Sequence, residues 1–190
     1  MVKGLAGLAA AVLAGLLGGT AYMIWSARAA DPYADCRGGA VGGGDIGGAF
    51  TLVDETGNTV TDKDVITKPS LVYFGYTFCP DVCPLDNARN AGDAITLATV
   101  PTFANRWLIP RLPLLAARQP SGGAAEQVKA ASLAYKTYFK KQDSGDEFYL
   151  MDHSTFTYLV LPDKGFVDFF QRDDTAEQMA ERVGCFLDKG

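Results

Sequence analysis

The residues best suited to chemistry in this sequence are two cysteines and one histidine. Cys79 and Cys83 stand four positions apart in the segment CPDVCP, and on a helical turn that spacing brings two side chains onto one face. His153 is the single histidine among 190 residues, so a site that needs an imidazole must use it. Two thiolates and one imidazole form a soft donor set that suits copper or zinc, and the ligand types alone do not choose between them.

Both cysteines also have uses other than metal binding. They could cycle between dithiol and disulfide in exchange with a partner, or form a permanent disulfide in an oxidising compartment. A structural disulfide is disfavoured because closing so short a loop restrains little chain entropy. Pro80 suits the first turn of a helix, and the partial positive charge at a helix N-terminus stabilises a thiolate. We therefore expect a reactive pair.

His153 has two interpretations as well. A lone histidine is commonly a structural residue with satisfied hydrogen bonds. Asp152-His153-Ser154, however, lies directly before a predicted buried strand, and rigid scaffolds display functional groups on such loops. Asp152 either orients the imidazole or is simply solvated. His153 is therefore a candidate metal ligand.

Apolar patterns predict the strands and helices that position these side chains. The continuous run at residues 71–74 predicts a central strand covered on both faces, and an Ala-rich stretch to about Leu97 predicts a helix after the cysteines. This alternation of strands and helices predicts an α/β layer structure resembling thioredoxin. The other predicted elements are a hairpin turning at residues 55–58, a helix at residues 124–140, strands at residues 156–161 and 166–170, and a final helix with the apolar stripe Met179, Val183 and Phe186.

The N-terminal segment is apolar and long enough to span a membrane. Residues 4–25 carry no charge over 22 positions, and about 20 residues suffice to cross a bilayer. We therefore predict a membrane anchor at residues 1–28. The alternative is a secretory signal peptide cleaved near Ala27 and Ala29.

The rest of the chain is predicted to form a tether and one domain. Gly-rich residues 29–48 predict a flexible tether, and residues 49–190 have the length of a single folded domain. A net charge of −5 and a pI near 4.8 exclude a protein that wraps nucleic acid, because such proteins gather Lys and Arg on one face. Lys3 and the free amino terminus favour a cytoplasmic N-terminus, with the domain outside.

The segment around the cysteines resembles a known family. Residues 71–84, LVYFGYTFCPDVCP, are similar to the motif of the Sco/SenC family, copper chaperones that help to build the binuclear copper A centre of cytochrome c oxidase. Asp152-His153-Ser154 and the residues that follow, to position 165, are similar to that family's second metal-binding region. The resemblance covers most of residues 46–98 and 124–188.

The resemblance implies a fold, a cargo, a partner and a location. It implies a thioredoxin-like domain on one N-terminal membrane helix, in the bacterial inner membrane with the domain in the periplasm. Copper, as Cu(I) or Cu(II), would be held by Cys79, Cys83 and His153. The implied partner is the copper A-bearing subunit of cytochrome c oxidase, and the copper donor is not identified.

Two enzymatic functions are the alternatives. In a membrane-anchored thiol–disulfide oxidoreductase, Cys79 and Cys83 would form a redox disulfide and act on the cysteines of a partner. The spacer of three residues disfavours this function, because thioredoxin-like redox motifs use two. A thiol peroxidase on the same fold is weaker still, because it leaves His153 without a role. No residue is assigned a catalytic role.

Residues 99–123 depart from the family pattern. Family members carry an apolar strand that ends in a segment like V-D-P-x-R-D-T, whereas this stretch holds four prolines, Trp107 and no acidic residue. Prolines cannot donate hydrogen bonds to a central ladder, so we predict that a central strand is missing or replaced there.

Two further cysteines remain. Cys36 lies in the predicted tether, and Cys185 lies off the apolar stripe of the final helix, so neither is expected in the core. An extracytoplasmic location favours a structural disulfide between them, and two free thiols are the alternative.

Overall fold

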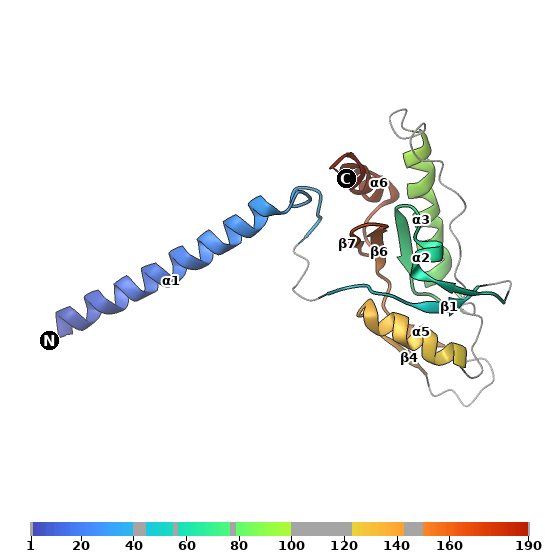
Figure 1. Ribbon diagram of the computed structural model, residues 1–190, viewed down its shortest axis with the longest axis horizontal. Coiled ribbons are helices and arrows are strands. Elements are labelled where there is room, and N and C mark those ends of the chain that lie inside the picture. The colour runs from blue at the N-terminus through green and yellow to red at the C-terminus, as the bar shows by residue number, and fades with distance from the viewer. Residues whose placement is uncertain are drawn as a thin grey trace.

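The computed structural model describes residues 2–39, 45–54, 57–76, 79–99, 123–142 and 150–189. It shows a layered α/β domain from which one long helix projects (Figure 1). The predicted fold class, a thioredoxin-like domain behind an N-terminal helix, is confirmed. The atypical stretch at residues 99–123 lies almost entirely outside the described residues.

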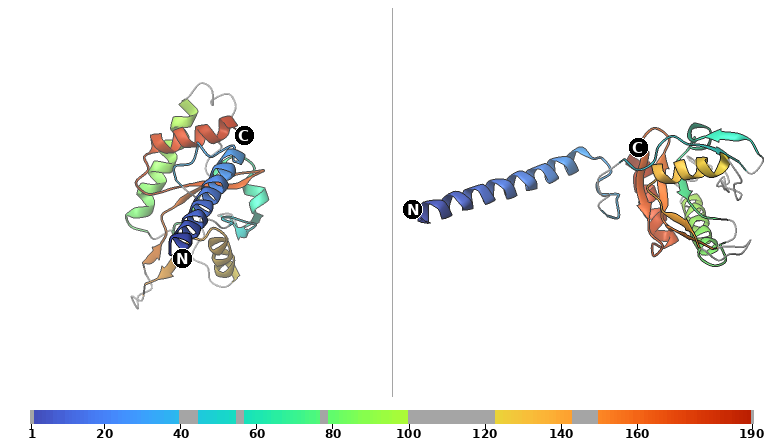
Figure 2. Two further views of the ribbon diagram at one scale, coloured as in Figure 1. Left: turned by 90° about the vertical axis from the view of Figure 1, so that its left-hand side faces the viewer. Right: turned by 90° about the horizontal axis from the view of Figure 1, so that it is seen from below.

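The projecting helix is α1 (Val2–Ala30), which stands clear of the domain in the right-hand view of Figure 2. Its segment Gly7–Ala27 spans 21 residues with a mean hydropathy of 1.7, and none of it is buried. Large apolar side chains, among them Leu13, Leu17 and Met23, are exposed. An unpacked apolar helix of this length is suited to the bilayer interior. α1 therefore fits the predicted membrane anchor.

A three-stranded antiparallel sheet carries the core. It consists of β3 (Ser70–Tyr73), β6 (Thr157–Leu161) and β7 (Gly165–Phe170) in the order β3-β6-β7. Every residue of β6 is buried. Among the described strands, β6 is therefore the central one. The strand predicted to be central, at residues 71–74, corresponds to β3, which pairs with β6 at the edge of this sheet. An apolar run indicates burial but does not show which strands pair.

Helices cover both faces of this sheet. α3 (Val82–Thr99) and α6 (Ala176–Lys189) contact each other on one face, and α5 (Gly123–Ala134) lies on the other. Side chains of β6 alternate between the two faces, as successive strand residues must. Leu159 and Leu161 join the cluster that includes α6, and Tyr158 and Val160 join the cluster that includes α5.

Two short hairpins complete the described structure. β1 (Thr51–Val53) and β2 (Thr59–Thr61) pair as the sequence predicts, and α2 (Asp62–Val65) follows them. β4 (Phe139–Lys141) pairs with β5 (Met151–His153).

The helix predicted at residues 124–140 ends at Ala134, so its predicted C-terminal part is wrong. Lys136 has a φ of 54°, a left-handed conformation through which a helix does not continue. Tyr138 matches helical spacing but is exposed, and the next residue begins β4. The pairing of β4 with β5 therefore sets the backbone here, and the apolar period does not.

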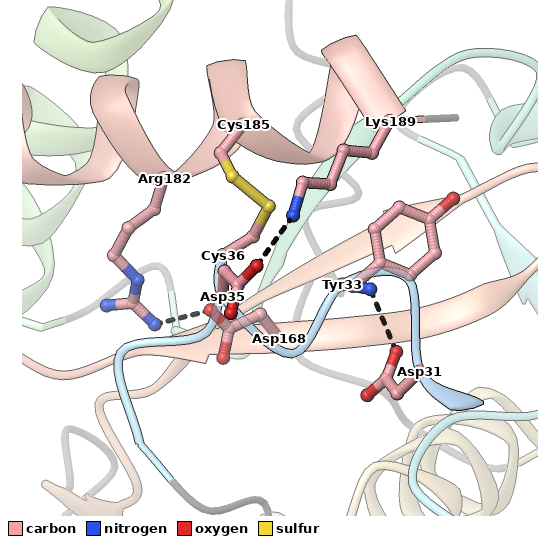
Figure 3. Close-up of a disulfide and its surroundings, with 8 residues drawn as sticks. All are labelled: Asp31, Tyr33, Asp35, Cys36, Asp168, Arg182, Cys185 and Lys189. Carbon is pink, nitrogen blue, oxygen red and sulfur yellow. Dashed lines mark hydrogen bonds and ion pairs between the residues drawn. A yellow bond between two sulfur atoms is a disulfide. The ribbon is translucent and has the colours of Figure 1, made fainter. Parts of the chain in front are cut away.

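Part of the predicted tether packs on the domain. Cys36 is 3% exposed and forms a disulfide with Cys185 of α6 (Figure 3). Tyr33 is buried too, with its ring centroid 5.2 Å from that of Phe186. The expectation that Cys36 lies outside the core is therefore wrong. Local composition indicated flexibility there, whereas contacts with α6, including a disulfide to a cysteine 149 positions away, determine the structure.

Polar contacts reinforce this docked segment. Lys189 of α6 pairs with Asp35 at 3.3 Å, and Arg37 Nε donates to the carbonyl of Val167 at 3.0 Å (Figure 3 shows the first). Arg37 also pairs with Asp31. Such solvent-accessible ion pairs contribute little, so the disulfide and the packing of Tyr33 hold the segment in place.

Replacing Cys36 and Cys185 with serine should lower the free energy of unfolding by about 2–4 kcal/mol, because a cross-link restricts the unfolded chain most when the loop it closes is long. Here the two cysteines are 149 positions apart. The measurement is urea unfolding of the full chain in detergent, in a background with Cys79→Ser and Cys83→Ser so that only this pair differs. Reduction of the intact pair in the same background serves as the control and should give the same loss. An unchanged midpoint in both samples would contradict the prediction.

Candidate metal centre

Cys79 and Cys83 lie where β3 leads into α3. Cys79 is in the loop after the strand, and Cys83 is the second residue of the helix. The amide of Cys83 donates to Cys79 Sγ at 3.2 Å, which satisfies one of the N–H groups that a helix start leaves unpaired. α3 begins at Val82, so Pro80 precedes the helix and does not occupy the predicted first turn.

His153 approaches the two sulfurs from the end of β5. Its Nδ1 lies 2.9 Å from the carbonyl of Ser154, so the N–H at Nδ1 donates there and Nε2 keeps its lone pair for a metal. Asp152, the other candidate for orienting the ring, is exposed and accepts a hydrogen bond from Gln142 at 2.6 Å. The backbone therefore orients the imidazole, and Asp152 does not.

The three candidate ligand atoms lie close together. Nε2 of His153 is 3.5 Å from Cys83 Sγ and 4.0 Å from Cys79 Sγ, and all three atoms lie within 4.8 Å of one another. Metal–sulfur bonds of about 2.3 Å and metal–nitrogen bonds of about 2.0 Å, at tetrahedral to trigonal angles, place sulfur and nitrogen roughly 3.5–3.8 Å apart. The three side chains are therefore arranged to hold one ion with little rearrangement.

The electrostatics of Cys83 differ from the expectation of an activated thiolate. Burial, followed by the hydrogen bond with Cys79, raises the pKa of Cys83 to about 11. Burial disfavours the charged form more than the nearby Tyr76 backbone and Tyr73 hydroxyl favour it. In the metal-free protein Cys83 is therefore a thiol at neutral pH, and an ion that binds there must displace its proton.

Sequence reasoning missed two residues beside the site, Tyr73 and Asp86. The Tyr73 hydroxyl donates to Asp86 Oδ2 at 2.8 Å. Burial, followed by the hydrogen bond to Asp86, raises the pKa of Tyr73, so the hydroxyl keeps its hydrogen. One signal was available, because Asp86 stands three positions after Cys83, on the same helix face.

Sequence comparisons place the chain among known proteins. The sequence profile of the SCO1/SenC family matches residues 39–98 and 117–188, which include Cys79, Cys83 and His153. This chain belongs to the SCO1/SenC family. Protein SenC of Rhodobacter capsulatus is 47% identical to it over 173 residues, a stretch that covers 83% of this chain and 78% of SenC.

Solved structures of SCO1/SenC proteins are similar as well. The structure of Bradyrhizobium japonicum ScoI with copper bound is 32% identical, with a TM-score of 0.53 over 73% of this chain and 98% of that chain. The structure of yeast Sco1 with copper bound is 27% identical, with a TM-score of 0.56 over 76% of this chain and 90% of that chain.

In this SCO1/SenC chain, position 75 lies beside the site and is expected to require glycine, because there is no room for a side chain. A Cβ at Gly75 would lie 2.8 Å from the ring of Tyr73 and 3.4 Å from Cys83 Sγ. Because Asp86 holds the Tyr73 hydroxyl, the ring cannot swing aside freely. Gly75→Ala should therefore cost about 1–3 kcal/mol of unfolding free energy.

Urea unfolding would measure this loss. Gly39→Ala is the matched control, because a Cβ there meets nothing within 4 Å, and its stability should stay within about 0.5 kcal/mol of the unsubstituted chain. Equal stability of the two variants would show that the site tolerates a methyl group at Gly75.

Proposed function

We propose that this chain binds copper through Cys79, Cys83 and His153 and delivers it to the copper A-bearing subunit of cytochrome c oxidase. The observation that carries the proposal is the convergence of two sulfurs and one oriented imidazole nitrogen within 4.8 Å. The copper-bound structures of ScoI and yeast Sco1, at 32% and 27% identity, support copper as the ion.

The chemistry of the donors suits an ion that must be passed on. Soft thiolates favour Cu(I), and imidazole also binds Cu(II). Three protein ligands would leave one position of a tetrahedral copper ion open. A ligand of the partner could bind the ion there before Cys79, Cys83 and His153 release it. Cys79 and His153 are partly exposed while Cys83 is buried, so the entering ligand would approach on the side of Cys79 and His153. Transfer is then an exchange of ligands that needs no redox step.

Thiol–disulfide exchange is the second candidate function. The observation in its favour is the contact between the two cysteines, in which the amide of Cys83 donates to Cys79 Sγ. Both thiols are free in the structure, and a dithiol can reduce a partner disulfide while it becomes a disulfide itself. This chemistry has no necessary use for His153.

The variant His153→Ala separates the two functions. We expect its Cu(II) affinity to fall at least a hundredfold, since removing even a group that orients a ligand costs 10- to 100-fold. It should fail to support oxidase assembly in a bacterial strain that lacks the native gene, yet still exchange its cysteines with a small disulfide. Cys79→Ser and Cys83→Ser should lose both properties.

Asp152→Ala is the matched control, because Asp152 neighbours His153 but is exposed and bonds Gln142. It should bind copper and support the oxidase as the unsubstituted chain does. Full oxidase activity with His153→Ala would favour the exchange function over copper delivery.

The proposed site of action is the periplasmic face of a bacterial inner membrane, with α1 as the anchor. The chain should remain in the membrane through alkaline carbonate extraction. A membrane-impermeant maleimide added to spheroplasts should label Cys79 or Cys83, the free cysteines. A variant with both replaced by serine is the control and should stay unlabelled. Labelling that requires lysis would place the domain in the cytoplasm and refute this orientation.

A further inference from the structure

The domain takes hold of the chain soon after α1 ends. The apolar span ends at Ala27 and the helix itself at Ala30. Tyr33, which follows shortly, is buried in the same cluster as residues of β6, β7 and α6. A link over residues 28–32, helical at its start, reaches about 15 Å at most, whereas a free tether over residues 29–48 would reach about 70 Å when extended.

The segment that follows the link is a compact turn. The amide of Tyr33 donates to Asp31 Oδ1 at 3.0 Å, and the amide of Cys36 donates to the Tyr33 carbonyl at 2.9 Å. Arg37 pairs with Asp31 across the turn. An aspartate that accepts a backbone N–H two positions on commonly fixes a turn in this way. The segment is therefore a preformed turn, which the disulfide and the Tyr33 ring hold against α6.

The glycine-rich run that comes next begins and ends on the domain. Gly38 passes over the Arg182 guanidinium so closely that a Cβ there would lie 2.5 Å from its carbon. Gly47 has a φ of 84°, which favours glycine, and its amide donates to the Ala134 carbonyl at 2.9 Å. The chain between these two glycines therefore joins two points of one domain, and its length does not set the distance from the domain to the membrane.

The attachment lies toward the end of the domain remote from the candidate metal centre. β6 starts beside the metal centre at Thr157 and runs to Leu161, which belongs to the same buried cluster as Tyr33. A strand of this length spans about 15 Å. Figures 1 and 2 show the same separation, because the chain from α1 arrives near the C-terminus, whereas β4, the partner of the strand that carries His153, lies toward the other end.

We propose that residues 31–38, the docked segment, hold the domain close to the bilayer and confine the metal centre to a narrow layer above the lipid. The acceptor of the ion is then a protein of the same membrane whose own site lies within that layer. A partner that diffuses freely in water would need no such limit on reach, and a long tether would serve it equally well. The inference rests on the proposed function only in taking α1 as the membrane anchor, and it does not depend on copper.

The experiment measures how far the metal centre stands from the lipid. The full chain carries Leu85→Cys, together with Cys79→Ser and Cys83→Ser, so that a single dye attaches at position 85 beside the site. Leu85 is 60% exposed and tolerates a label. The chain is placed in phosphatidylcholine vesicles with an acceptor dye on the headgroups of both leaflets. Energy transfer then reports the mean distance from the dye to the bilayer surface, whichever way the chain inserts.

One Gly-Ser insertion at two alternative places decides the matter. Placed between Ala30 and Asp31, about ten flexible residues lengthen the link and should raise the mean distance by roughly 15 Å. Placed after Gly39, where a Cβ meets nothing within 4 Å, the same insertion should leave the distance unchanged. Equal effects at the two places would show that residues 29–48 act as one free tether and would overturn the proposal. No effect at either place would also overturn it, because the link would not then set the height of the domain.

A release variant tests what holds the docked segment. Tyr33→Ala with Cys36→Ser and Cys185→Ser removes both the packed ring and the disulfide. In this background the insertion after Gly39 should raise the distance as much as the insertion in the link does. A distance that still ignores the insertion after Gly39 would overturn the role of Tyr33 and the disulfide.

Lys189→Ala is the matched control for the release variant. Lys189 pairs with Asp35 of the docked segment, but the pair is solvent accessible and contributes little. The insertion after Gly39 should therefore remain without effect in Lys189→Ala. An effect as large as in the release variant would mean that any change in this contact frees the segment, and would overturn the assigned role of Tyr33 and the disulfide.

Flotation of the vesicles separates failure of this inference from failure of the proposed function. A chain that does not float with the vesicles has no anchor in α1, which refutes the proposed location and the role of the docked segment together. A chain that floats but responds alike to the insertion at both places refutes the role of the docked segment alone, and leaves the anchor and copper binding as proposed.

Discussion

The pairing of β3 with β6 brings the candidate ligands together. The register sets Tyr73 opposite Thr157 in antiparallel strands, so the end of β3 and the start of β6 lie at the same edge of the sheet. The loop with Cys79 leaves β3 at this edge, and His153 lies just before β6, which explains how residues 74 positions apart meet. A slip of one residue would turn Tyr73 away from α3, because neighbouring strand residues face opposite sides. The geometry of the site thus depends on the register of two short strands.

The sequence alone predicts the type of fold and points to the three residues that the structure brings together, because both leave local signals. Cys79 and Cys83 share one short motif directly after an apolar strand, and the single histidine leaves no choice of imidazole. The final helix was predictable for a similar reason, since its buried residues Met179, Val183 and Phe186 follow helical spacing. Such patterns belong to one element and need no knowledge of its partners.

The sequence does not predict features that arise from contacts between two distant segments of the chain. Tyr73 looks like one more residue of a buried strand until α3 places Asp86 beside it. The pairing of Cys36 with Cys185 was expected, but residues 31–37 have the composition of a linker, and their packing against α6 and β7 was not predicted. Tyr138 fits a helical pattern, but strand pairing takes the following residue into β4. In each case a tertiary contact outweighs the local preference of the chain.

Metal binding and disulfide formation compete for the same two sulfurs. The metal ligand is a thiolate, so a Cys79–Cys83 disulfide cannot hold the ion, and whatever keeps the pair reduced also keeps it ready to bind. Burial adds a second condition, since it raises the pKa of Cys83 to about 11 and an ion must displace that proton. A soft ion such as Cu(I) forms bonds to sulfur strong enough to offset this cost, whereas hard ions such as Mg²⁺ and Ca²⁺ prefer oxygen and gain little. The cost of deprotonating Cys83 is the same for every ion, so the preference for soft ions comes from the two sulfur ligands, and burial raises the affinity that any ion must have to bind.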